Sequence, residues 1–259
     1  MARVLVTGSV SGLGRAAAQA LLADGHDVTV HARSARRATD ADDLVEQGAA
    51  VVVGDLAELD EVRDLAGQVA RLAPFDAVIH NAGVLGGPDR QPTSHGHPTV
   101  LTVNVLAPYL LTALVARPRR LVVLSSDMHH RGTTCLDDIE WTERRWNRTQ
   151  AYSDSKLLVT VLAAAIARRW PDVPCNAVDP GWVPTRMGGP AASDDLQLGH
   201  ETQVWLATSE DPAATTTGGY WYHRRRRSPA AGVHDADLQD RLLLELARLT
   251  GTSLAGDAP

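Results

Sequence analysis

The sequence predicts an α/β fold in which helices cover both faces of a doubly wound, mostly parallel sheet of seven strands. Short apolar segments alternate with helical segments along all 259 residues, and neither a repeat nor a linker interrupts them. Strands that are apolar throughout are typical of parallel sheets, because helices bury both of their faces. We therefore expect one domain spanning residues 1–259, a length that a single α/β domain commonly has.

The expected strands are short β-rich or apolar runs, several of which stop at glycine or polar residues. In chain order they are Arg3–Thr7, Val28–Ala32, Ala50–Val53, Asp76–His80, Arg120–Ser125, Cys175–Val178 and Thr217–Tyr222. The expected helices lie between them and after the last one. They are Gly14–Ala23, Asp40–Gln47, Leu59–Leu72, Val100–Ala116, Ala151–Trp170 and Ala236–Leu249. The termini and residues 186–200 have the least regular pattern.

Composition limits the partners and the compartment. A formal charge of −6 argues against a general nucleic-acid binder, and we interpret the short basic run Arg224–Arg227 as a solvated or salt-bridged edge. Cys135 and Cys175 have neither metal-ligand spacing nor disulfide density, so reduced thiols in a cytoplasm are expected. The first residues run directly into a strand, without a signal peptide. The longest apolar stretch, Leu157–Ala167, is too short to span a bilayer.

A glycine-rich turn links the first strand to the first helix. Its sequence is Thr7-Gly8-Ser9-Val10-Ser11-Gly12-Leu13-Gly14, with the spacing Gly-x-x-x-Gly-x-Gly. Glycines let the backbone turn tightly and let a pyrophosphate approach the helix N-terminus, where unpaired N–H groups favour anions. We expect this turn to hold a dinucleotide through Gly8, Ser11, Gly12, Leu13 and Gly14.

The end of the second strand indicates which nucleotide is bound. An acidic side chain there would hold the 2′-hydroxyl of NAD, but the chain has His31-Ala32-Arg33-Ser34. A guanidinium pairs well with phosphate, so Arg33 is predicted to meet the 2′-phosphate of NADP, with Arg36 and Arg37 as candidate helpers. NADP is therefore preferred, with NAD as the alternative.

The only lysine of the chain, Lys156, follows Tyr152 by four residues. On a helix the two side chains lie on one face, about one turn apart. A phenol normally titrates near pH 10, and a neighbouring cation favours its ionised form. We therefore expect Lys156 to lower the pKa of Tyr152 and to make it a general acid or base.

The glycine-rich turn and the pair Tyr152 and Lys156 resemble motifs of the short-chain dehydrogenase/reductase family. The resemblance is to the compact single-domain kind and covers nearly the whole chain. Three further segments match family motifs: Asp55-Leu56, which would lie against adenine, Asn81-Ala82-Gly83, and Pro180-Gly181-x-Val183-x-Thr185 at the nicotinamide end. The helix around Tyr152, the late Gly-Gly-Tyr and the extra residues before Tyr152 are similar to retinol-dehydrogenase-like members and to ketoreductases of the daunorubicin-ketoreductase type. The resemblance implies a Rossmann-type fold.

The resemblance also implies a catalytic tetrad of Asn104, Ser126, Tyr152 and Lys156. In the mechanism that the resemblance implies, a nicotinamide gives a hydride to a carbonyl carbon while Tyr152 donates a proton to the carbonyl oxygen. Ser126, a better match than Ser125, would hold that oxygen. Lys156 would bind the nicotinamide ribose, and Asn104 would hold a water that links Lys156 to solvent.

Two departures from the family concern the substrate end. Asp179 precedes Pro180 where His or Asn is frequent, and the interval between Ser126 and Tyr152 is long. This extension is interpreted either as a wall of the substrate pocket or as a surface elaboration. Met128, Trp182 and Met187 are the predicted substrate contacts, and they suggest an apolar carbonyl compound.

Three further questions concern metal, rival functions and assembly. His129-His130, and His95 with His97, lack carboxylate or cysteine partners, so no metal site is expected. A dehydratase- or epimerase-like enzyme and a non-catalytic NADP(H)-sensing regulator are the alternatives. The helices predicted at residues 100–116 and 151–170 are compatible with a homodimer or a tetramer.

Overall fold

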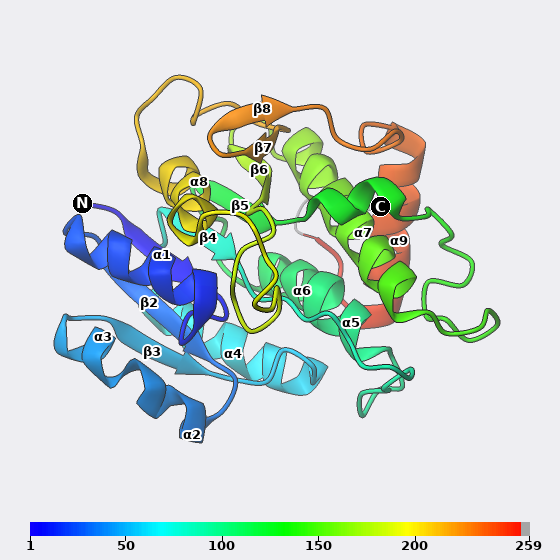
Figure 1. Cartoon of the computed structure of the whole chain (residues 1–259), viewed down its shortest axis with the longest axis horizontal. Helices are drawn as coiled ribbons and strands as arrows, with labels where there is room; N and C mark the ends of the chain where they lie inside the picture. The colour runs from blue at the N-terminus through cyan, green and yellow to red at the C-terminus, as the bar shows by residue number, and fades with distance from the viewer. Residues whose placement is uncertain (255–259) are drawn as a thin grey trace.

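A twisted sheet of eight strands forms the centre of the molecule in the computed structural model, which describes residues 1–254 (Figure 1). The strands are β1 (Arg3–Val6), β2 (Asp27–Ala32), β3 (Ala50–Val53), β4 (Ala77–His80), β5 (Arg120–Leu124), β6 (Cys175–Asp179), β7 (Tyr220–Tyr222) and β8 (Arg225–Arg227). Their order across the sheet is β3-β2-β1-β4-β5-β6-β7-β8, and only β7 and β8 pair antiparallel. The Rossmann-type prediction is confirmed, although the count of seven strands was wrong by one.

The eighth strand is the basic run that we expected to be an edge. The turn between β7 and β8 consists of His223 and Arg224, whose φ angles are 48° and 59°. Two successive residues with positive φ make a hairpin turn whose twist matches the strands. Because Asn-Gly or Asp-Gly normally marks such a turn, this hairpin has no sequence signal. The three arginines of β8 are exposed at the edge of the sheet.

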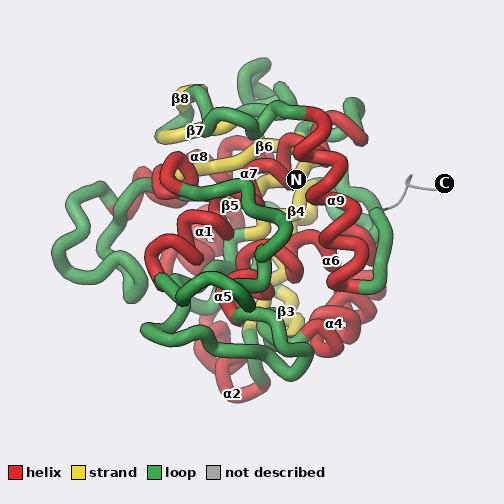
Figure 2. Tube along the Cα trace, turned by 90° about the vertical axis from the view of Figure 1, so that its right-hand side faces the viewer, coloured by secondary structure: helices red, strands yellow, loops and turns green. Residues whose placement is uncertain are grey.

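Helices cover both faces of the sheet (Figure 2). One face is covered by α4 (Leu59–Leu72), α6 (Ala107–Leu114), α7 (Arg148–Arg169) and, outside α7, α9 (Ala236–Thr250). The other is covered by α1 (Gly12–Ala23), α3 (Asp42–Glu46) and α8 (Leu196–Thr208). The short helices α2 (Ala35–Ala38) and α5 (Thr99–Leu101) complete the set, together with 3₁₀ turns at Thr39–Ala41 and Asp127–Arg131 and a π-helical turn at Thr102–Leu106.

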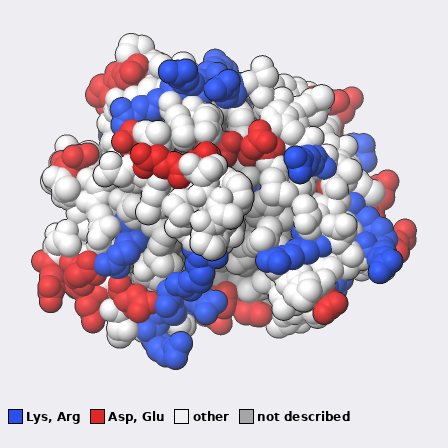
Figure 3. Space-filling model, in the orientation of Figure 1, with Lys and Arg blue, Asp and Glu red and all other residues white. Residues whose placement is uncertain are grey.

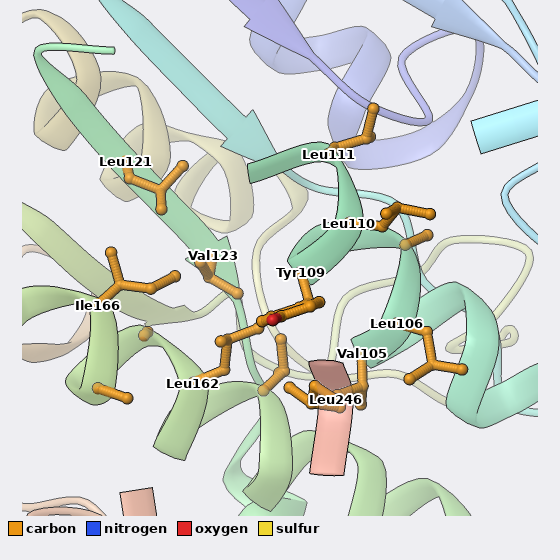
Figure 4. Packing of buried hydrophobic residues seen from close by; sticks show 14 of the residues in the cluster. Val105, Leu106, Tyr109, Leu110, Leu111, Leu121, Val123, Leu162, Ile166 and Leu246 are labelled. Carbon is orange, nitrogen blue, oxygen red and sulfur yellow. The ribbon is translucent and has the colours of Figure 1, made fainter. Parts of the chain in front are cut away.

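Each strand contributes to both cores, because successive side chains point to opposite faces of a sheet. In β1, Leu5 packs beneath α4, α6 and α7, whereas Val4 and Val6 pack beneath α1 and α8. Tyr109 is fully buried in the first core, and its hydroxyl donates to the carbonyl oxygen of Thr252 at 2.9 Å. Figure 4 shows it surrounded by aliphatic side chains of β5, α6, α7 and α9.

Four helices differ from the sequence expectation. The Val100–Ala116 helix is divided by the π-helical turn, and the Asp40–Gln47 helix is replaced by a 3₁₀ turn and the short helix α3. Helix α8 was not predicted at all. The helix α7 begins at Arg148, three residues earlier than expected, because the Asn147 side chain caps the amide of Gln150.

Candidate active site

The predicted tetrad gathers where the carboxyl ends of β4 and β5 meet α7. Tyr152 and Lys156 lie one turn apart on α7, and the Lys156 ammonium nitrogen is 5.7 Å from the centre of the Tyr152 ring. The ammonium donates to the carbonyl oxygen of Leu124, the last residue of β5, at 2.8 Å. Both side chains are buried, with exposed fractions of 7% for Tyr152 and 4% for Lys156.

Burial controls the protonation of this pair, and our expectation for Tyr152 was wrong in sign. Burial raises the pKa of Tyr152 to about 12, against a hydrogen bond from Ser126 that lowers it. Burial also lowers the pKa of Lys156 to about 8, while the carboxylate of Asp179 raises it. Desolvation therefore outweighs the hydrogen bond from Ser126, and the phenol of Tyr152 is protonated at neutral pH.

The two adjacent serines point in different directions. The hydroxyl of Ser125 is buried and lies 2.6 Å from the hydroxyl oxygen of Thr160, on the side of α7. The half-buried Ser126 hydroxyl is next to Tyr152 and also accepts from the amide of Met128 at 3.3 Å. Of the two, only Ser126 faces the phenol.

Asn104 lies in the π-helical turn, beside the Gly83 backbone. Its side chain accepts from the amide of Val84 at 2.8 Å and donates to the Val84 carbonyl at 3.0 Å and to the Ser155 hydroxyl at 2.9 Å. A Cβ atom on Gly83 would be 3.3 Å from the Lys156 ammonium and 3.4 Å from the Asn104 oxygen. Asn104 and Lys156 therefore both approach Gly83 from the side where a Cβ atom would lie. The turn has the form frequently found at functional sites.

The glycine-rich turn has the close packing that the pyrophosphate hypothesis needs. Gly8 and Gly12 have φ angles of 64° and 58°, which favour glycine. A Cβ atom on Gly14 would be 2.5 Å from the Gly8 carbonyl oxygen and would overlap the Asn81 amide. Helix α1 starts at Gly12, and its N-cap residue Ser11 makes no side-chain cap bond. The first amides of α1 therefore face the turn without that competitor.

A buried histidine that the sequence analysis did not single out holds this turn in place. The Gly8 amide donates to His31 Nδ1 at 2.9 Å, and His31 Nε2 lies 2.7 Å from the Gly54 carbonyl oxygen. The second bond requires a proton on Nε2, so the ring is neutral, in line with burial lowering the pKa of His31. Nothing in a lone histidine at a strand end distinguishes this role from ordinary packing.

Asn81 joins the turn to β4 and still has an unused acceptor. Its amide nitrogen donates to the carbonyl oxygens of Thr7 and Gly8, at 2.9 and 3.3 Å. Its oxygen Oδ1 is buried without a hydrogen-bond partner among residues 1–254. A buried acceptor without a partner is costly, so a ligand donor at this position fits the residues present.

Arg33 is exposed just after β2 and makes no hydrogen bond or ion pair with any described residue. The guanidinium of Arg37, by contrast, pairs with Asp40 at 2.6 Å. Figure 3 shows basic side chains gathered over α2, next to this strand end. Asp55, at the end of β3, accepts from the amide of Ala57 at 2.9 Å, and Leu56 is buried behind it.

Helix α8 brings the predicted nicotinamide segment against the glycine-rich turn. A Cβ atom on Gly199 would be 2.8 Å from Leu13 and 2.9 Å from Val183, so both side chains converge on this glycine. Thr185 lies over Gly12, with its methyl carbon 3.8 Å from a Cβ built there. At the start of this segment, the amide of Gly181 donates to Asp179 at 3.0 Å.

An apolar cluster surrounds Tyr152 on the solvent side. Its members come from the segment after β4, from α5 and from the extension before α7: Val100, Trp141, Ala151 and Tyr152, with Val84, Leu85, Met128 and Trp146 half-buried against them. The extension is held to α7 by Arg144, which pairs with Asp154 at 3.0 Å. Of the two interpretations of the extension, the structure therefore favours a wall beside Tyr152.

The other predicted substrate contacts are not in this cluster. Trp182 and Met187 lie in the loop before α8 and are 53% and 43% exposed. A cavity of ≈ 580 Å³ lies elsewhere, between β8 and the segment before α9, and none of the tetrad residues lines it. Within residues 1–254, no helix is long and apolar enough to cross a bilayer, and no group of three His, Cys, Asp or Glu side chains is arranged to hold a metal ion.

Known proteins share both the sequence and the fold. The family model described as "short chain dehydrogenase" matches residues 2–196. The short-chain dehydrogenase chry4 of Gibberella zeae is 40% identical over 257 residues, which cover 98% of this chain and 99% of that protein. A Streptomyces protein with the provisional name daunorubicin C-13 ketoreductase DnrU is 36% identical, and the match covers 92% of this chain and 89% of that protein.

Solved structures lead to the same family. An uncharacterised protein of Mycobacterium paratuberculosis has a TM-score of 0.84 and 26% identity, covering 98% of this chain and 95% of that chain. A provisionally named NAD(P)-dependent gluconate 5-dehydrogenase of Beutenbergia cavernae, with bound NADP, has a TM-score of 0.66 and 25% identity, covering 86% and 94% of the two chains. The protein therefore belongs to the short-chain dehydrogenase/reductase family and is an NAD(P)-dependent oxidoreductase.

Proposed function

We propose that this oxidoreductase acts, as one catalytic unit of residues 1–259, to reduce the carbonyl group of an apolar ketone or aldehyde with NADPH. The observation that carries the proposal is the contact between a protonated, buried Tyr152 and Ser126 beside an apolar cluster. A general acid must hold its proton at working pH and must have a partner that fixes the substrate oxygen. The raised pKa of Tyr152 supports the first condition, and the hydroxyl of Ser126 beside it is our candidate for the second.

In the proposed mechanism, bound NADPH supplies the hydride. Tyr152 donates its phenolic proton to the oxygen of the substrate carbonyl, and Ser126 donates a hydrogen bond to the same oxygen. Lys156, which is buried and held by the Leu124 carbonyl, stabilises the phenolate left on Tyr152 and binds the ribose of the nicotinamide. Asn104 keeps the segment around Gly83 against Lys156 and holds the water through which the proton is replaced.

The preference for NADPH rests on Arg33. Its guanidinium is exposed and unpaired among the described residues, and no carboxylate stands at the end of β2. A 2′-phosphate would pair with it. The bound NADP in the Beutenbergia structure supports this choice, since that protein has the same fold.

The apolar substrate is inferred from what surrounds Tyr152. Val84, Leu85, Met128 and Trp146 are half-buried there, and none of them carries a charge. The daunorubicin ketoreductase name of the Streptomyces relative is consistent with a polycyclic ketone. The intact set of Ser126, Tyr152 and Lys156 argues against a non-catalytic nucleotide sensor.

A substrate panel tests the proposal. Aryl ketones, quinones and long-chain aldehydes should support NADPH oxidation, whereas sugar phosphates should not. In the same assay Ser126→Ala should lose most of its kcat, and Ser125→Ala, whose hydroxyl points to Thr160, should lose much less. Preference for sugar phosphates, or the reverse order of the two serines, would contradict this assignment.

A further inference from the structure

His129 lies two positions after Asp127 in the 3₁₀ turn that follows Ser126, and its side chain is completely buried. Its ring nitrogen Nδ1 is 2.8 Å from the carbonyl oxygen of Ser126, which also accepts from the His129 backbone amide at 3.0 Å. The other ring nitrogen, Nε2, accepts from the amide of Ala230 at 2.9 Å. One imidazole therefore joins the Ser126 peptide to the segment before α9.

The two bonds determine the tautomer of His129. An amide can only donate, so Nε2 is the unprotonated acceptor and Nδ1 carries the proton that goes to the Ser126 carbonyl. Burial lowers the pKa of His129 to about 4, so the ring stays neutral at physiological pH. The ring is also packed 4.5 Å from that of Tyr220, which prevents it from turning freely.

The backbone around Ser126 is held at two points, one peptide unit before it and at its own carbonyl. The Ser125 amide donates to the Val178 carbonyl of β6 at 2.7 Å, and the Ser126 carbonyl is held by His129. Ser126 itself is extended, with φ −167° and ψ 153°. Because the Cβ direction follows from the backbone, these bonds set the direction of the Ser126 Cβ, and the bond from the Met128 amide at 3.3 Å holds the hydroxyl oxygen. A change of about 1 Å in such a group is enough to slow a reaction strongly.

We propose that His129 is a positioning residue whose Nδ1–H aims the Ser126 hydroxyl at the substrate oxygen, while its Nε2 anchors the segment before α9 to the active site. This inference rests on the proposed role of Ser126. It requires that the two bonds of the imidazole have separable effects. The Nδ1 bond to Ser126 should affect turnover, and the Nε2 bond to Ala230 should affect the anchoring of residues 228–232.

Two amide side chains separate those effects. The amide of Asn can replace Nδ1 as a donor but does not reach Ala230, and the amide of Gln can replace Nε2 as an acceptor but leaves the Ser126 side without its donor. We expect His129→Asn to keep kcat within about threefold of wild type and to melt at lower temperature. We expect His129→Gln to lower kcat about tenfold, with an unchanged Kd for NADPH.

A double-mutant cycle with Ser126→Ala then identifies the route of the effect. If His129 acts through the Ser126 hydroxyl, His129→Gln should change kcat less than twofold once that hydroxyl is gone. His130→Gln is the matched control, because His130 is the exposed neighbour with its ring centre 4.0 Å from that of His129, and it should leave kcat unchanged.

The possible results differ in what they overturn. Equal losses of kcat in His129→Asn and His129→Gln, or a His129→Gln effect that persists with Ser126→Ala, would show a purely structural role and refute the inference. An inactive Ser126→Ala beside a fully active His129→Gln would refute it while leaving the proposed function intact. A fully active Ser126→Ala would remove the proposed role of Ser126 and this inference with it. If His129→Gln does not fold, His129→Asn alone still tests the inference. A folded His129→Asn that has lost turnover would refute it, because this variant keeps a donor for the Ser126 carbonyl.

Discussion

Tyr152 and Lys156 show how burial changes the meaning of a sequence motif. From sequence, a cation four residues away should lower the pKa of the phenol, and the structure has the reverse outcome because both groups are desolvated. A protonated phenol is the form that a reductase needs at the start of its cycle. In the proposed mechanism the charge of Lys156 matters most after Tyr152 has given up its proton, when Lys156 faces a phenolate rather than a phenol.

The pKa of Lys156 makes activity depend on pH in a defined direction. Since that pKa is lowered to about 8, the ammonium is charged below this pH and neutral above it. We predict that kcat/KM for NADPH is level near pH 7 and falls as pH rises through about 8, because the value reports groups of the free enzyme. Steady-state rates across this range measure it.

A matched variant identifies the titrating group. Lys156→Arg keeps its charge throughout, since arginine does not titrate in this range. Its kcat/KM, although lower, should show no inflection near pH 8. The same inflection in both proteins would assign it to another group.

Arg33 is predicted to select the cofactor. Arg33→Asp should weaken NADPH binding at least tenfold, since a hydrogen bond to a charged group contributes about 1.5–3 kcal/mol, and should improve NADH relative to NADPH. Arg37→Asp is the control: its guanidinium already pairs with Asp40, so a smaller loss is expected. Cofactor fluorescence titrations compare the two. An unchanged NADPH affinity in Arg33→Asp would mean that another group holds the 2′-phosphate.

Among the elements, α8 connects the two parts of the predicted cofactor site, the glycine-rich turn and the segment after Pro180. Gly199 lies within it, where a side chain would collide with Leu13 and Val183. We predict that Gly199→Ala weakens NADPH binding and lowers the free energy of unfolding by about 1–3 kcal/mol, as overpacking of a core does. Calorimetry and cofactor titration measure the two effects.

Gly67→Ala tests whether that loss comes from packing. Gly67 is in the exposed part of α4, with no atom within 4 Å of an added Cβ. Because alanine is the better helix former by about 0.5–1 kcal/mol, this variant should gain stability. If Gly199→Ala and Gly67→Ala changed stability and NADPH binding in the same way, the close packing of α8 against Leu13 would be contradicted.

The elements that sequence analysis found are those with strong local patterns. The strands β1 to β6 and the long helix α7 were predicted from continuous apolar runs, and α4 and α9 from apolar residues that recur at the helix period. Helix α8 was missed, since it has a glycine near its start and follows an irregular segment. The π-helical turn depends on Asn104 bonding to a distant loop, which no local pattern records.

The molecule as a whole determines which of the predicted site residues meet. The strand order places β1 beside β4, and the chain leaves these two strands toward opposite faces of the sheet. Dinucleotides bind in the crevice at this point of such folds. Motifs in strand-end turns were therefore predictable. The roles of His31, Gly199 and His129 were not, because each depends on contacts between segments far apart in sequence.

Removal of the phenolic oxygen of Tyr152 tests the proposed role of this residue as proton donor most directly. Tyr152→Phe removes the phenolic hydroxyl and keeps the ring that packs against Val100 and Trp141. We predict that the variant binds NADPH with wild-type affinity and reduces the best carbonyl substrate about 10²–10⁴-fold more slowly, the range of general acid catalysis. Turnover within tenfold of wild type, with cofactor binding intact, would show that Tyr152 is not the proton donor.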